Sequence, residues 1–192
     1  MQWAISRFSK GISSGEKKAS RINEPPCWLV VSFSKPFLMA NLKEGDLAPD
    51  FTAVSETGET FTLGSFQGKK LILFFYPKDD TPGCTAESCN LRDNYSLLQQ
   101  KGFAILGVSP DSAAKHSKFK EKYALPFPLV PDTNQDLLKS YGAWGTKQMY
   151  GKSYEGVIRT TFVIDETGKI EKIFTKVDTK NHTEQILKAL GA

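Results

Sequence analysis

The feature that most constrains this chain is an apolar run that ends at a proline. Leu71-Ile72-Leu73-Phe74-Phe75-Tyr76 is followed directly by Pro77. The run has the length of one strand and is rich in β-forming residues, so it predicts a buried strand that leads into a tight loop. Thr81-Pro82-Gly83 then breaks the chain, and helix formers with near-helical apolar spacing begin at Cys84. Cys84 is therefore expected in or just before the first turn of a helix.

A cysteine at this position has a specific chemical use. The first turn of a helix presents unpaired backbone N–H groups and roughly half a unit of positive charge, which favours a thiolate over a thiol. Because the thiolate is the nucleophilic form, Cys84 is a candidate nucleophile, and the alternative is a buried structural cysteine.

A second cysteine, Cys89, lies five residues further on. In a regular helix the Cα atoms of Cys84 and Cys89 would be about 8.7 Å apart on different faces, beyond the roughly 7 Å limit for a disulfide. A bond between them therefore requires the first turn of the helix to unwind.

The rest of the pattern alternates strands with helices. One hairpin is predicted from residues 48–54 and 60–63, and a second from 159–164 and 170–174. Strands are also expected at 103–108 and 127–130, and helices at 84–101, 112–123, 135–141 and 181–190. This order predicts an α/β domain with a mixed central sheet, helices beside it and an N-terminal β-hairpin.

Composition limits the class of protein. The 192 residues are 40% hydrophobic, which suits one well-buried domain, and no apolar stretch approaches the ~20 residues of a membrane span. Six basic and two acidic residues in the first 38 positions account for the whole net charge of +4. The remaining chain is balanced, so we expect no nucleic-acid partner and no membrane partner.

The first 38 residues do not resemble the start of a domain. Their basic, Ser-containing character is compatible with an organelle transit peptide, and equally with sequence translated from a start codon set too early. We favour the second interpretation, with Met39 as the start of the domain at 39–192 and an extension at 1–38 that is disordered. Cys27, in that extension, is expected to have no catalytic role.

Three cysteines without a regular framework suit a reducing compartment such as the cytoplasm better than a secreted scaffold. The chain has no Cys-x-x-Cys pair, and His116 and His182 are far from both helix cysteines in sequence, in segments read as polar helices. We therefore expect no metal.

The loop and its neighbours resemble the peroxiredoxins, thiol peroxidases in which a Pro-x-x-x-Thr-x-x-Cys loop holds the reactive cysteine. Pro77, Thr81 and Cys84 match that loop, and the spacing to Cys89 is similar to that of the bacterioferritin comigratory protein or peroxiredoxin Q subfamily. The resemblance runs from about residue 42 to the C-terminus. Its later motifs are Tyr141-Gly142-Ala143-Trp144-Gly145, Gly151-Lys152 and the stretch 156–165.

The resemblance implies a thioredoxin-like fold and a metal-free, haem-free and flavin-free peroxidase for hydrogen peroxide and organic hydroperoxides. Cys84 would be the peroxidatic cysteine and Cys89 the resolving one, with thioredoxin as reductant and a monomeric protein. A protein of this kind serves antioxidant defence and redox homeostasis.

The resemblance also implies roles for neighbouring residues. Thr81 would hold thiolate and peroxide through its hydroxyl, and Pro77 would shield the thiolate. Arg159 would stabilise the thiolate and the peroxide oxygens, and Glu87 would orient this arginine, unless it is a solvated helix carboxylate.

Other interpretations remain for these residues. Cys89 is otherwise a buried helix cysteine without a redox role, Thr81 an ordinary loop threonine and Arg159 a surface arginine. Trp144, Tyr150 and Tyr154 would line the approach to the site or simply pack.

Two other functions compete with the peroxidase. One is a general disulfide reductase, which normally uses a Cys-x-x-Cys motif that this chain lacks. The other is a redox sensor whose disulfide switches a partner surface; it would also be oxidised by peroxide but would turn over slowly with thioredoxin.

Overall fold

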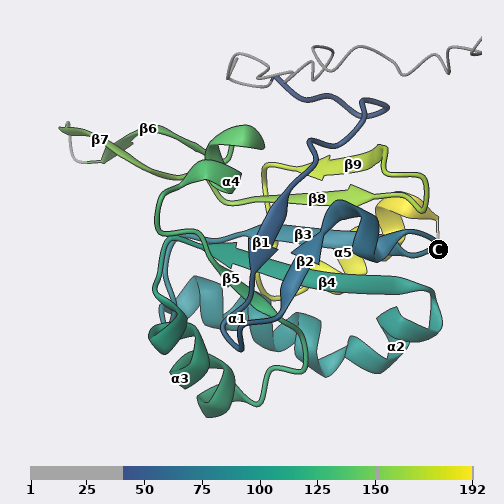
Figure 1. The fold of residues 1–192 in the computed structure, drawn as a ribbon, viewed down its shortest axis with the longest axis horizontal. Helices are drawn as coiled ribbons and strands as arrows, with labels where there is room; N and C mark the ends of the chain where they lie inside the picture. Colours follow the sequence, from purple (N-terminus) through teal and green to yellow (C-terminus); the bar gives the residue numbers. More distant parts are fainter. Residues whose placement is uncertain (1–40, 150–151, 192) are drawn as a thin grey trace, which may run out of the picture. The chain divides into compact units, whose positions relative to one another are not determined.

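The apolar run forms β3 (Lys70–Phe75), the middle strand of a five-stranded sheet in a computed structural model that describes residues 41–149 and 152–191 (Figure 1). The strand order is β5-β4-β3-β8-β9. β3 pairs in parallel with β4, and β4 with β5, whereas β8 and β9 are antiparallel to their neighbours. The predicted mixed sheet is confirmed. The other four strands are β4 (Phe103–Ser109), β5 (Leu129–Pro131), β8 (Thr160–Ile164) and β9 (Ile170–Phe174).

The remaining elements flank this sheet or extend from it. The N-terminal hairpin is β1 (Thr52–Val54) with β2 (Thr60–Thr62), followed by a short 3-10 helix, η1 (Leu63–Phe66). The helices are α1 (Pro82–Asp93), α2 (Tyr95–Gln100), α3 (Ala113–Tyr123), α4 (Asp136–Ser140) and α5 (His182–Leu190). A second hairpin, β6 (Trp144–Met149) with β7 (Lys152–Val157), extends away from the central sheet in Figure 1.

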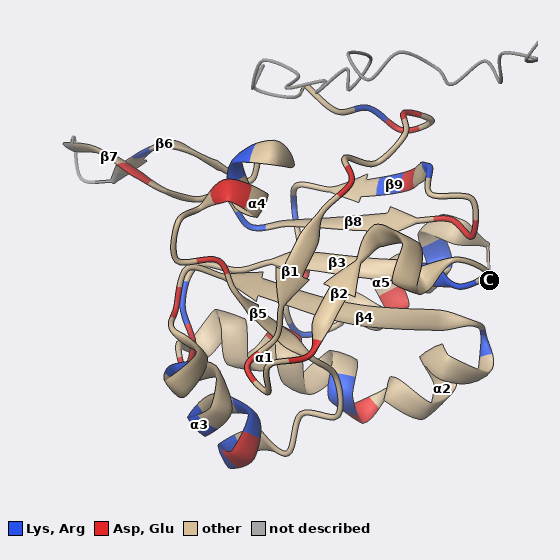
Figure 2. Ribbon diagram, viewed as in Figure 1, with Lys and Arg blue, Asp and Glu red and all other residues tan. Residues whose placement is uncertain are grey.

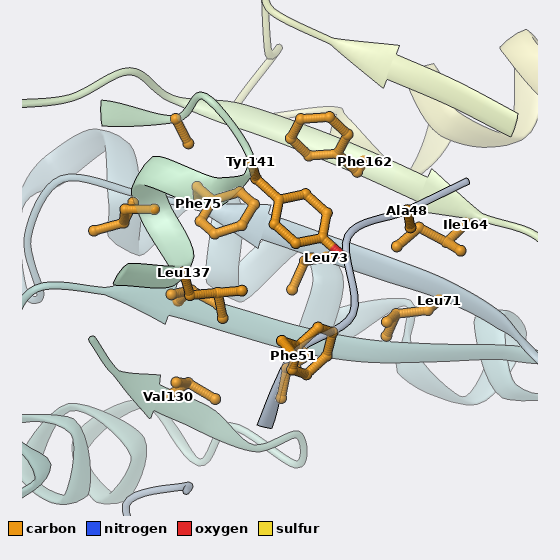
Figure 3. Close-up of a cluster of buried hydrophobic side chains, with 14 of the residues drawn as sticks. Ala48, Phe51, Leu71, Leu73, Phe75, Val130, Leu137, Tyr141, Phe162 and Ile164 are labelled. Atoms are coloured by element: carbon orange, nitrogen blue, oxygen red, sulfur yellow. The ribbon is translucent and has the colours of Figure 1, made fainter. Parts of the chain in front are cut away.

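Alternate side chains of β3 point into two separate cores, as a strand buried on both faces requires. Leu71, Leu73 and Phe75 join one core with residues of α4, and Tyr141 lies at its centre (Figure 3). The Tyr141 ring is 5.4 Å from that of Phe75, and its hydroxyl donates to the Pro49 carbonyl at 2.7 Å.

The opposite face of β3 carries the cysteine helix. Ile72 and Phe74 join a second core that also contains Leu91 of α1, Ile186 of α5 and Cys84 itself. Burial on this face seats α1 and α5 against the same sheet, and this places the start of α1 at the end of β3.

The predicted helix at 84–101 is wrong in one respect, because the structure has two helices there. α1 ends at Asp93, and the side-chain Nδ2 of the next residue, Asn94, donates to the Asn90 carbonyl at 2.8 Å. Asparagine side chains compete in this way for backbone groups that would otherwise continue a helix. The separation between α1 and α2 follows from that competition.

The β6–β7 hairpin is absent from the elements predicted from the sequence. Gly145 and Gly156 face each other in its register, and interior glycines weaken a strand signal. Trp144 packs against the first core, whereas Tyr154 is 44% exposed. Tyr150 lies outside the described residues, as do the predicted extension 1–38 and Cys27.

Charged residues gather on the helices and loops and are absent from β3, β4 and β8 beyond Lys70 (Figure 2). Within the described part of the chain, no helix has the length and apolar character needed to span a bilayer.

Candidate active site

Cys84 is the third residue of α1, as the sequence predicted. Thr81 precedes the helix in an extended conformation (φ −100°, ψ 150°) and Pro82 is its first residue, where a missing N–H has no consequence. The Thr81 hydroxyl donates to the Lys78 carbonyl at 3.0 Å, within the loop itself. Its oxygen retains lone pairs that can accept a hydrogen bond.

Arg159, which is far from Cys84 in the sequence, contacts that cysteine in the structure. Its Nη2 donates to Cys84 Sγ at 3.1 Å, and Cys84 is only 1% exposed. The sheet explains this meeting of residues 75 positions apart, because Phe75 at the end of β3 is paired with Thr160 at the start of β8. The alternative of a surface arginine is wrong.

Glu87 holds the second arm of the same guanidinium. Its carboxylate is completely buried and forms an ion pair with Arg159 Nη1, so the alternative of a solvated helix carboxylate is wrong. Burial raises the pKa of Glu87 to about 7, although the charge of Arg159 opposes this effect. Burial also acts to lower the pKa of Arg159, but Glu87 and Cys84 outweigh it and the pKa is raised.

The environment expected for His182 is wrong. This first residue of α5 is fully buried, with Nε2 2.9 Å from Thr161 Oγ1 and 3.9 Å from Glu87 Oε1. Burial lowers the pKa of His182 to about 4. Glu87 Oε1 itself has no hydrogen-bond partner among the described residues. No local pattern in the sequence distinguishes such a histidine from a surface one.

His116 is likewise buried, although most of its neighbours in α3 are exposed. Its Nδ1 lies 2.7 Å from Asp79 Oδ2 and its Nε2 lies 3.2 Å from the Val130 carbonyl. Tyr76 donates to the other Asp79 oxygen at 2.8 Å, and the Asp79 backbone N–H donates to Asp111 at 2.7 Å. This buried network anchors the loop between β3 and α1 to α3, to β5 and to the loop that joins β4 to α3.

Two other predicted residues lie in the adjoining loop and in the same helix. Pro77, half-buried, follows the end of β3, and Cys89 is a free, half-buried thiol in the same helix as Cys84. Lys147 of β6 was not predicted. The pKa of Lys147 is lowered, first by burial and then by the charge of Arg159, while the charge on Cys84 acts in the opposite direction. The β6–β7 hairpin therefore places a lysine within electrostatic range of Arg159 and Cys84.

The arrangement suits attack by a thiolate. The N-terminal end of α1 and the Arg159 guanidinium both place positive charge beside the Cys84 sulfur, and such charge stabilises a thiolate. The guanidinium offers further donors to an incoming oxygen anion. Among residues 41–149 and 152–191, no cluster of three or more His, Cys, Asp and Glu side chains has an arrangement that could hold a metal ion.

Comparison with known proteins gives a consistent result. A model described as the AhpC/TSA family matches residues 45–173. Peroxiredoxin Bcp of Escherichia coli strain K12 is 43% identical over 149 residues, which cover 78% of this chain and 96% of that protein. A solved structure of Xanthomonas campestris peroxiredoxin Q has a TM-score of 0.71 at 34% identity, covering 80% of this chain and 98% of the other.

A second structural relative is the bacterioferritin comigratory protein of Xanthomonas campestris. It has a TM-score of 0.69 at 34% identity and covers 73% of this chain and 90% of that one. These likenesses confirm the thioredoxin-like fold with its mixed central sheet. The chain belongs to the AhpC/TSA family and, within it, to the peroxiredoxins of the bacterioferritin comigratory protein and peroxiredoxin Q subfamily, which are thiol peroxidases.

Proposed function

We propose that this protein reduces hydrogen peroxide and organic hydroperoxides through a cycle of Cys84 and Cys89, with thioredoxin or a similar dithiol as reductant. The observation that carries the proposal is the 3.1 Å contact between Arg159 Nη2 and Cys84 Sγ in a buried site at the start of α1. The Xanthomonas campestris relative is described for alkyl peroxide reduction, which supports organic hydroperoxides as substrates.

In the first step the Cys84 thiolate attacks the terminal peroxide oxygen. A sulfur–oxygen bond forms, the oxygen–oxygen bond breaks, and the leaving oxygen takes a proton to become water or an alcohol. Sulfur supplies the two electrons. Arg159, held by Glu87, stabilises the thiolate and the charge that moves to the leaving oxygen.

The loop supplies the remaining functions of this step. The Thr81 hydroxyl accepts a hydrogen bond from the incoming peroxide, or donates one to it after leaving the Lys78 carbonyl, 3.0 Å away. Pro77 has no N–H and shields the thiolate by its shape.

In the second step Cys89 condenses with the Cys84 sulfenic acid. The Cys89 thiol loses its proton, the sulfur–sulfur bond forms, the sulfur–oxygen bond breaks, and the departing hydroxide takes up a proton to become water. The disulfide is then reduced by dithiol exchange, in which the reductant becomes the disulfide. Cysteines used in this way indicate a reducing compartment such as the cytoplasm, and we propose a monomer whose catalytic domain is 39–192.

Substitution of each cysteine tests these roles. Cys84→Ser removes the nucleophile, so peroxide consumption should be abolished. Cys89→Ser should consume about one equivalent of peroxide and then stop as a sulfenic acid that a dione probe can trap. Intact-mass measurement after one equivalent of hydrogen peroxide distinguishes these outcomes in both variants. In wild type it should show a Cys84–Cys89 disulfide.

Two results would contradict the proposal. Equal loss of activity in both variants, with no trapped sulfenic acid in Cys89→Ser, would contradict the roles assigned to Cys84 and Cys89. Oxidation of wild type without rapid turnover in the presence of thioredoxin and its reductase would favour the redox sensor instead.

A further inference from the structure

One carboxylate oxygen beside the reactive cysteine is buried without a hydrogen bond. Glu87 Oε2 accepts from Arg159, whereas Glu87 Oε1 has no hydrogen-bond partner among the described residues, although the side chain is completely buried. An unpaired buried acceptor is costly, and more so when it is charged. Nε2 of His182, also fully buried, faces this oxygen at 3.9 Å, which is too long for a hydrogen bond.

The hydrogen bonds of His182 determine which ring nitrogen carries its proton. Gln185 Nε2 donates to the Lys176 carbonyl at 2.8 Å, and Gln185 Oε1 accepts the Asp178 backbone N–H at 3.0 Å. Gln185 Oε1 is therefore an acceptor, so His182 Nδ1, 3.0 Å from it, is the donor. A neutral ring with its proton on Nδ1 has an unprotonated Nε2 with one lone pair.

Two acceptors consequently face each other in the interior. The Thr161 hydroxyl, 2.9 Å away, donates to the lone pair of His182 Nε2, and Glu87 Oε1 lies on the same side of the ring nitrogen. Repulsion between this nitrogen and the oxygen disfavours the ionised carboxylate, and a proton on Oε1 removes the repulsion. Burial acts in the same direction, since it raises the pKa of Glu87 to about 7 and lowers the pKa of His182 to about 4.

The proton on Glu87 decides how the charge of Arg159 is used. Arg159 donates through Nη1 to Glu87 Oε2 and through Nη2 to Cys84 Sγ, the latter at 3.1 Å. Oε2 accepts this bond in both states of the carboxyl group, so the guanidinium keeps its place. When Glu87 is ionised, however, a second negative charge touches the guanidinium and offsets the field that stabilises the leaving oxygen.

We propose that His182 is a positioning residue that keeps a proton on Glu87 and thereby leaves the positive charge of Arg159 free to act on the reacting atoms. This inference rests on the proposed function, because its effect is on the peroxide step. It concerns the folded site, before the first turn of α1 unwinds for disulfide formation. Release of the Glu87 proton to solvent as pH rises should therefore slow the attack of the Cys84 thiolate on peroxide.

Other charged or titratable groups also act on these atoms. They are Cys84 of α1, Arg159 immediately before β8, Asp178 in the loop before α5 and Lys147 of β6. Hydrogen bonds from Asn181 and from nearby backbone groups lower the pKa of Asp178, and the pKa of Arg159 is raised although burial opposes this, so both stay charged near neutral pH. Cys84 and Lys147 are the groups that an experiment has to separate from Glu87.

The pH dependence of the peroxide step tests the proposal. From about pH 5.5 to 8.5, rapid-quench mixing with peptide mass spectrometry gives the rates at which hydrogen peroxide oxidises Cys84 and iodoacetamide alkylates it. Both reactions need the thiolate, so their ratio cancels its ionised fraction, and alkylation releases iodide without forming an oxygen anion. In wild type the ratio of oxidation to alkylation should fall about fivefold as pH rises through about 7, a factor equivalent to about 1 kcal/mol.

Two substitutions should move the midpoint of this fall in opposite directions. His182→Gln places an amide N–H donor near Glu87 Oε1, which stabilises the ionised carboxylate, so the midpoint should move to lower pH by about one unit. Thr161→Val removes the hydroxyl that occupies His182 Nε2, which then accepts the Glu87 proton, so the midpoint should move to higher pH. A merely structural role for either residue would not give shifts of opposite sign.

Two further variants serve as controls. Glu87→Gln keeps an acceptor for Arg159 and is neutral at every pH, so its ratio should stay at the value that wild type shows at low pH. Lys147→Gln should retain the fall, because the titrating group is Glu87. Circular dichroism checks the fold of each variant, and Thr161→Val tests the direction of the shift if His182→Gln does not fold.

A ratio independent of pH in wild type would overturn the proposal. So would a fall that persists in Glu87→Gln or disappears in Lys147→Gln, or an unshifted midpoint in folded His182→Gln or folded Thr161→Val. If Cys84 in wild type is alkylated by iodoacetamide but not oxidised by hydrogen peroxide, the proposed function fails, and this inference with it. The wild-type sample therefore separates the two failures.

Discussion

Glu87 and His182 show how burial sets the charge of single residues beside the reactive cysteine. Both are fully buried, and they face each other at 3.9 Å. Burial raises the pKa of Glu87 from 4.5 to about 7 and lowers the pKa of His182 from 6.5 to about 4. Burial therefore shifts both groups towards their neutral forms, whereas Arg159, whose pKa is raised, stays charged.

These two shifts predict opposite effects of pH on stability. The folded protein keeps the Glu87 proton longer than the unfolded chain, so Glu87 lowers stability as pH rises from 4.5 to about 7. His182 takes up its proton later than in the unfolded chain, so its contribution is lost as pH falls from 6.5 to about 4. In wild type the two slopes largely cancel.

Substitution should reveal each slope separately. Relative to wild type, Glu87→Gln should gain stability by about 3 kcal/mol as pH rises through this range, and His182→Asn should lose a similar amount. Urea unfolding of the reduced proteins at a series of pH values between 4.5 and 7 measures both. Parallel curves for all three proteins would show that these groups titrate normally.

At the scale of elements, the expected and observed structures differ at a break within one predicted helix and at one hairpin. Strand β3 and the starts of α1 and α3 follow from local signals, and each lies within two residues of its predicted start. The α1–α2 break and the β6–β7 hairpin were missed, because they depend on side-chain bonds and on pairing between glycine-containing strands.

The end of α3 carries an energetic penalty that can be measured. Ala124 ends this helix with φ 50° and ψ 48°, a left-handed conformation that favours glycine. Ala124→Gly should therefore stabilise the protein by up to about 1 kcal/mol, seen as a higher urea midpoint with an unchanged slope. Ala114→Gly, in the helical part of α3, should destabilise it by about 0.5–1 kcal/mol. Destabilisation by both would show that the conformation of Ala124 carries no strain.

At the scale of the whole molecule, the close packing of the sheet against its helices holds the site together. Gly107 lies in β4, an interior strand of the sheet, where an added Cβ would come within 2.7 Å of Leu129 and 2.8 Å of Phe74. Such an approach forces neighbouring side chains to shift, which is costly in a closely packed core.

Gly107→Ala is therefore expected to destabilise the protein by about 1–3 kcal/mol in urea unfolding. Gly156→Ala is the matched control in a strand, because its Cβ would meet the Tyr154 ring at an ordinary 3.4 Å. Equal midpoints for the two variants would mean that the second core adapts to the extra methyl group.

The sequence by itself determined the features that depend on neighbouring residues. The strand before Pro77, the helix start at Cys84 and the spacing to Cys89 are local, and local propensities and periodicity specify them. Arg159 and Glu87 were named only through the family resemblance, since no local signal joins residues 72 positions apart.

Only the tertiary structure decided which side chains meet. Pairing of β3 with β8 brings Arg159 to Cys84. Packing of α5 beside α1 buries His182 and brings the Thr183 backbone N–H within hydrogen-bond distance of Asn90 Oδ1. The physical reason is that contacts across a sheet or between helices depend on register and burial, which are settled when the whole core assembles.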